Sequence, residues 1–176
     1  MMSAPARKLG LLAHVVTSVG WLGAVATSLA LGIAGMVSGD ASTVRAVYLT
    51  MDVVGWSVLV PLSLLSLATG LVQALGTRWG LLRHYWVLFK LGMNLLASVV
   101  LLLYMQTLGA IAEAARSSVG DNLGAIRSPS PVIHAGGAIA LLLVATILSI
   151  YKPPGRTGYG NRPSAGARRV PHGSGA

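Results

Sequence analysis

Four polar side chains stand in or beside the apolar stretches of this sequence and are the first candidates for chemistry: His14, His84, Lys90 and Asn94. Charged and titratable groups in hydrocarbon are costly, and they often mark functional sites. Neutral imidazole is an axial ligand of haem iron, and the ammonium of Lys90 could hold a porphyrin propionate. These four residues are therefore the predicted cofactor-binding set, with haem b as the possible cofactor.

A second polar pair consists of Asp52 and His134, which we expect on the opposite side of the membrane. A carboxylate and an imidazole are ligands for zinc or copper, and Met93 or Met105 could add a soft donor for cuprous ion. The spacing matches no specific metal motif. Asp52 and His134 are therefore the weaker, metal-binding prediction.

Each candidate also has a purely structural interpretation. Lys90 can extend its ammonium to the headgroups, and His84 can be part of an interfacial anchor. His14 can be a neutral ring bonded to a neighbouring helix, and Asp52 can bond to His134. These alternatives stay open at the level of sequence.

The composition defines the class of protein. The 176 residues are 54% hydrophobic and 10% charged, with a mean hydropathy of +0.72, which is typical of a membrane protein. The absence of cysteine excludes disulfides and thiolate metal sites. The net charge of +9 comes from basic residues that flank apolar runs or lie in the tail, so we predict no nucleic-acid partner.

Four charge-free intervals, each long enough for the roughly 20 residues of a membrane-spanning helix, organise the chain. We predict an all-α integral membrane four-helix bundle over residues 9–152, preceded by a segment 1–8. Pro61 should interrupt the second helix. The predicted helices cover residues 9–36, 44–75, 82–114 and 131–151.

The distribution of basic residues predicts the orientation. Arg7, Lys8, Arg78 and Arg83 fall on one side together with the basic residues of the tail, whereas the other side has fewer. The positive-inside rule therefore predicts a multi-pass protein of the cell membrane with both termini in the cytoplasm. Residues 153–176 are rich in Gly, Pro, Arg and Ser, which predicts a disordered cytoplasmic tail that binds anionic lipid headgroups.

Small and polar residues at helical spacing predict which faces point inward. We expect the paired glycines of the first and fourth helices, Gly32 with Gly35 and Gly136 with Gly137, to allow close helix approach. On the third helix, Lys90 and Asn94 share the predicted face. The predicted face of the first helix is His14, Ser18, Trp21, Val25, Ser28, Gly32 and Gly35, and that of the second is Asp52, Trp56, Leu59, Ser63, Ser66, Gly70 and Gln73.

The motifs on the first three helices resemble a broad group of small bacterial membrane proteins. They read His14-x6-Trp21-x-Gly23, Asp52-x8-Pro61-x8-Gly70 and Trp86-x3-Lys90-Leu91. The group contains uncharacterised integral-membrane families, the membrane domain of copper-resistance protein D and, more remotely, the four-helix protoporphyrinogen oxidase of haem synthesis. The resemblance to the oxidase implies haem binding, with His14 and Lys90 as essential residues.

The functional prediction is a small multi-pass membrane protein of an uncharacterised family that binds haem or a metal between its helices, without a predicted enzymatic role. The alternatives are a haem- or porphyrin-linked membrane redox enzyme, a copper-handling permease and an accessory subunit of a membrane complex. The bilayer is the expected partner, and a homo-oligomer is a further possibility.

Overall fold

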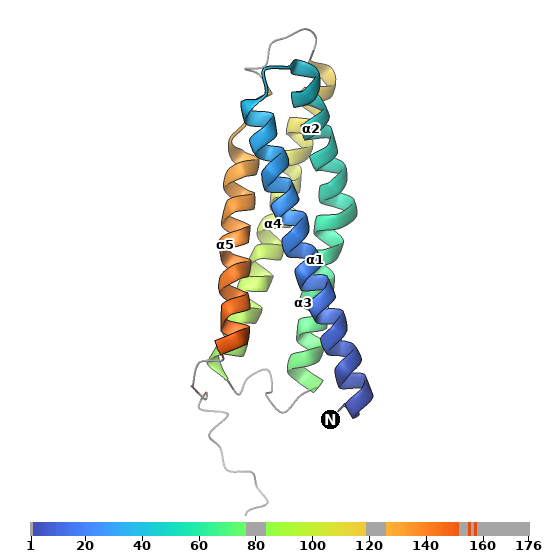
Figure 1. Cartoon of the computed structure of the whole chain (residues 1–176), viewed down its shortest axis with the longest axis vertical. Helices are drawn as coiled ribbons and strands as arrows, with labels where there is room; N and C mark the ends of the chain where they lie inside the picture. Colours follow the sequence, from blue (N-terminus) through green and yellow to red (C-terminus); the bar gives the residue numbers. More distant parts are fainter. Residues whose placement is uncertain (1, 77–83, 119–125, 152–154, 156, 158–176) are drawn as a thin grey trace, which may run out of the picture.

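The computed structural model describes residues 2–76, 84–118, 126–151, 155 and 157, and it confirms the predicted all-α four-helix bundle (Figure 1). Arg78, Arg83 and the predicted tail, apart from Gly155 and Thr157, lie outside the described residues. The elements are α1 (Ala4–Val37), α2 (Ala41–Val54), the π-helical turn η1 (Gly55–Leu59), α3 (Val60–Gly76), α4 (Tyr85–Ser117) and α5 (Ser130–Tyr151).

Four helical stretches are long and apolar enough to cross a membrane, since α2, η1 and α3 form one continuous span over Ala41–Gly76. Large apolar side chains cover the outside of the bundle, as expected where lipid is the surrounding solvent. Among the most exposed are Leu9, Val19, Phe89, Leu103 and Ile150.

The first helix begins at Ala4 rather than at Leu9. The Ser3 side chain accepts a hydrogen bond from the Ala6 amide at the start of the helix, and Pro5 occupies a favoured first-turn position. Arg7 and Lys8 therefore belong to α1 and not to a separate terminal segment.

Asp40 caps the start of the second span, which begins at Ala41. Its carboxylate accepts hydrogen bonds of 2.6 Å from the hydroxyl groups of Ser42 and Thr43 and one of 2.8 Å from the Thr43 amide. These bonds stabilise the charged form, so they lower the pKa of the exposed Asp40 carboxyl. The cap explains why the helix starts at Ala41, before the predicted Val44.

The regular α-helix of the second span is interrupted by the π-helical turn Gly55–Leu59, whereas Pro61, the predicted point of interruption, is the second residue of α3. The structure corrects one residue of the inward face predicted for the second helix, because Trp56 is 54% exposed. A π turn contains more residues than an α turn, so it rotates the following residues around the helix axis. Gly55 and Leu59 are buried there, and Trp56 points away from the bundle.

The predicted face of α1 is largely confirmed. Trp21, Val25 and Ser28 are buried, and Gly32 and Gly35 are buried beyond them. A Cβ atom at Gly32 would come within 3.2 Å of Val132 on α5, and one at Gly35 within 3.2 Å of Val47 on α2, so glycine permits both helix contacts.

The glycine prediction is wrong for α5. A Cβ atom on Gly136 or Gly137 would meet no heavy atom within 4 Å among the described residues. Neither glycine of this pair therefore mediates a close helix contact in the described bundle.

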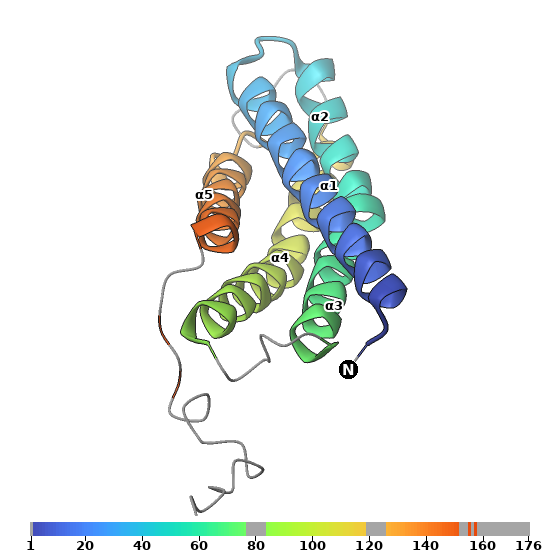
Figure 2. The same ribbon diagram turned by 60° about the horizontal axis from the view of Figure 1, so that its bottom comes forward.

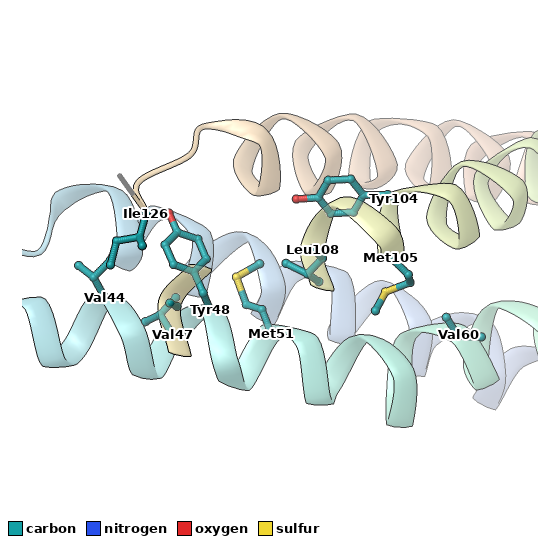
Figure 3. Packing of buried hydrophobic residues seen from close by; sticks show 10 residues of the cluster. Val44, Val47, Tyr48, Met51, Val60, Tyr104, Met105, Leu108 and Ile126 are labelled. Atoms are coloured by element: carbon teal, nitrogen blue, oxygen red, sulfur yellow. The ribbon is translucent and has the colours of Figure 1, made fainter. Parts of the chain in front are cut away.

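The two ends of the bundle are packed differently. A cluster of buried side chains joins α2 and α4 at the end that contains Asp40 (Figure 3). At the other end, which holds the N-terminus and the last turn of α5, the helices diverge, and Figure 2 shows the start of α4 apart from the end of α5 (Figures 1 and 2). The core cluster is formed by Val44, Val47, Tyr48, Met51, Val60, Tyr104, Met105, Leu108, Ala115 and Ile126.

A candidate anion-binding cavity

A cavity of about 460 Å³ lies at the N-terminal end of the bundle, and side chains from α1, α3, α4 and α5 line it. This volume is within the range of ligand sites in proteins. We call it the basic cavity. Its described walls are Arg7, Lys8, Leu11, His14, Leu67, Gly70, Gln73, Ala74, Trp86, Val87, Lys90, Leu91, Asn94 and Ser149.

His14 is held against α3. Its Nδ1 atom lies 3.1 Å from Thr69 Oγ1, and a Cβ atom on Gly70 would come within 3.0 Å of its ring. The Thr69 hydroxyl donates its proton to the Leu65 carbonyl oxygen at 2.6 Å, so Thr69 Oγ1 accepts a hydrogen bond from His14 Nδ1–H. In the neutral ring, Nε2 is then the nitrogen with a free lone pair.

A hydrogen-bonded layer connects three helices beside His14. Ser18 on α1 and Ser66 on α3 share a 2.9 Å hydrogen bond, and Asn94 Nδ2 on α4 donates to Ser66 Oγ at 3.3 Å. The Asn94 Oδ1 atom is buried and accepts no hydrogen bond from the part of the chain that the structure describes. Asn94 therefore presents an unused acceptor while also lining the basic cavity.

Three cationic side chains lie on the wall of this cavity: Arg7, Lys8 and Lys90. No Asp or Glu is present among its described lining residues. Lys90 is half-buried, close enough to His14 for an electrostatic interaction, and makes no hydrogen bond or ion pair with any described residue. An anion that enters the cavity would meet this ammonium without competition from a carboxylate.

The structure brings three of the four predicted cofactor-binding residues to one cavity: His14, Lys90 and Asn94. His84 is the residue directly before α4, and its ring lies 6.4 Å from that of Trp86. His84 is not among the described lining residues, so the cavity does not join it to His14.

The predicted metal pair is separated. Asp52 Oδ2 lies 3.4 Å from an Arg116 nitrogen, whereas His134 donates from Nδ1 to the Ser130 carbonyl oxygen at 2.8 Å. No hydrogen bond joins Asp52 to His134, and no group of three or more His, Cys, Asp or Glu within the described ranges could hold a metal ion. A metal site at this pair stays a prediction without structural support.

Sequence reasoning missed Thr69, which orients His14, and it assigned Arg7 and Lys8 only a topological role. Thr69 lies one helical turn from both Ser66 and Gln73, a spacing that placed it close to the predicted face. Arg7 and Lys8 reach the cavity because α1 continues past the predicted boundary. In comparisons with known proteins, no family model, no curated protein and no solved structure matches this chain.

Proposed function

We propose that this small multi-pass membrane protein binds an amphipathic anion in the basic cavity, and that this anion is haem b. The single observation that carries the proposal is the cavity itself, where an imidazole and the ammonium of Lys90 lie on a largely apolar wall with no Asp or Glu among its described residues. A porphyrin with propionates has the matching distribution of apolar surface and negative charge.

The side chains fit a haem with one protein imidazole. His14 would bind iron through Nε2, since Thr69 occupies Nδ1, and such a second hydrogen bond is usual for ligating histidines. Arg7, Lys8 and Lys90 would hold the propionates. The haem would supply one-electron redox chemistry, with a potential that depends on its axial ligand and burial.

We further propose that the chain is oriented with both termini in the cytoplasm. The basic cavity would then open near the cytoplasmic headgroups, where Arg7 and Lys8 reinforce the positive charge of this end. Binding of the tail to anionic lipid and assembly into a larger complex stay predictions of the sequence.

The test is haem binding by the detergent-purified protein after expression with haem supplied. We expect a Soret band that His14→Ala removes, because the iron loses its protein ligand. His134→Ala is the matched control, since His134 lies outside this cavity, and it should keep the band. Absence of a Soret band in the unaltered protein would refute the proposal.

A second experiment distinguishes the proposed iron ligand, His14, from the proposed propionate-binding group, Lys90. Lys90→Met should weaken binding of both haem and iron-free porphyrin, because each carries propionates. His14→Ala should weaken binding of haem far more than binding of the iron-free ring. Equal effects of His14→Ala on both ligands would contradict the assignment of His14 to iron.

A further inference from the structure

A second cavity, of about 360 Å³, lies deeper in the bundle, between α1, the second span, α4 and α5. We call it the apolar cavity. Its wall is almost entirely hydrocarbon, including Val25, Leu59, Leu101 and Leu141, and it shares no described lining residue with the basic cavity. It is therefore a separate site with a different chemical preference.

Two hydrogen-bond donors on this wall, Trp21 Nε1–H and the Tyr104 hydroxyl, make no hydrogen bond with any described residue, and the indole N–H can only donate. Trp21 lines the cavity and is 1% exposed, and its Nε1–H group makes no hydrogen bond. Buried polar groups in proteins almost always have partners, and an unmade hydrogen bond is more costly in a low-dielectric interior. A ligand with an acceptor oxygen would satisfy the Trp21 indole.

Aromatic rings also form part of the wall. The rings of Tyr104 and His134 are stacked, with centroids 4.0 Å apart and an angle of 18° between their planes. Both residues line the apolar cavity, as does Trp21. Such surfaces favour a flat conjugated ring over a flexible chain.

The cavity opens toward lipid between α4 and α5. Five of its lining residues are exposed: Leu96 and Val100 on α4, and Ile133, His134 and Gly137 on α5. The outside of these spanning helices faces hydrocarbon, so a ligand would enter from the membrane.

We propose that the apolar cavity binds a lipid-soluble quinone, with a ring carbonyl oxygen accepting the hydrogen bond of Trp21 Nε1–H. The apolar walls exclude a charged ligand. The unpaired indole requires an acceptor, the aromatic residues favour a planar ring, and the lateral opening admits a molecule that partitions into the membrane. The proposal does not depend on haem in the basic cavity.

The test is calorimetric titration of the detergent-solubilised protein with a decyl-substituted benzoquinone, with empty micelles subtracted. We expect saturable binding that Trp21→Phe weakens about fivefold to tenfold, because this change keeps the aromatic ring and removes one hydrogen bond. Trp56→Phe is the matched control, since Trp56 is exposed and lies outside the cavity, and it should bind like the unaltered protein.

Gly137→Phe provides an independent variant if Trp21→Phe disturbs folding. A Cβ atom at Gly137 meets no heavy atom within 4 Å among the described residues, so a bulky side chain there should obstruct the opening without a core clash. We expect it to abolish quinone binding.

Several results would overturn the proposal. These are the absence of saturable quinone binding, equal affinities of the Trp21→Phe and Trp56→Phe proteins, and equal binding of a decyl ester that lacks the ring. His14→Ala should leave quinone binding unchanged. Failure of the haem proposal would therefore leave the quinone proposal intact.

Discussion

The position of the His14 ring depends on Gly70, a residue without a side chain. The ring packs onto Gly70 and bonds to Thr69, so α3 determines both the place and the tautomer of the imidazole. The same ring lines the basic cavity together with Lys90, and no Asp or Glu is among the described lining residues. At this scale, the site combines one oriented imidazole with the ammonium of Lys90, which makes no ion pair with any described residue.

Gly70→Val should therefore weaken haem binding without removing the ligand. The new side chain would enter the space of the His14 ring, which lies 3.0 Å from the ideal Cβ position. We expect affinity to fall by roughly tenfold or more, as is usual when the support of a metal ligand is lost. Titration with haem, followed by absorption, measures this effect.

Gly23→Val is the matched control on α1, because a Cβ atom there meets nothing within 4 Å among the described residues. Its haem affinity should equal that of the unaltered protein. If Gly70→Val also retained full affinity, the contact between Gly70 and His14 would not position the ligand.

The π-helical turn is the element that adapts the second span to α4. Gly55 begins the turn, and an ideal Cβ atom there would lie 2.5 Å from Met105 Cε. Met105 belongs to the buried core, so the turn places a residue without a side chain where the Met105 side chain of α4 packs against the second span. The same turn directs Trp56 outward.

Gly55→Val should destabilise the bundle. Forcing extra methyl groups into a packed core costs about 1–3 kcal/mol, and Met105 can relieve only part of this by moving its terminal atoms. We expect a lower midpoint of thermal unfolding in detergent, and we expect Met105→Ala to restore part of the loss in the double variant.

Gly136→Val offers the comparison on α5, since no described heavy atom lies within 4 Å of its Cβ position. It should unfold close to the midpoint of the unaltered protein. Equal midpoints for the Gly55 and Gly136 variants would show that the turn tolerates a side chain.

Across the whole molecule, the main core cluster and the two cavities lie at different positions along the bundle axis. The Asp40 end contains the larger core cluster and the ion pairs of Arg116 with Asp52 and Glu113. The N-terminal end contains the basic cavity, and the apolar cavity lies farther along the bundle between α1, the second span, α4 and α5. A protein arranged in this way can bind a charged ligand and an apolar ligand at separate sites.

The orientation can be tested with single cysteines, because the chain has none of its own. We expect a membrane-impermeant maleimide to label Gly39→Cys in intact cells and to label Ser3→Cys only after the membrane is opened. These positions lie at opposite ends of α1, and the positive-inside rule places Ser3 in the cytoplasm. The reverse labelling pattern would reject the proposed orientation.

The sequence alone was sufficient for the number of helices and for the buried face of α1. A helix in hydrocarbon must satisfy its backbone hydrogen bonds internally, so long apolar intervals predict spans directly, and regular α-helical spacing carries Trp21, Val25 and Ser28 to one side.

Only the tertiary structure decided how residues on different helices meet. The π-helical turn changed the face that includes Trp56. Asp52 pairs with Arg116 and makes no hydrogen bond with His134, and Arg7 lines the same cavity as Lys90. These outcomes depend on how helices rotate and tilt against one another, and residue spacing within one helix does not contain that information.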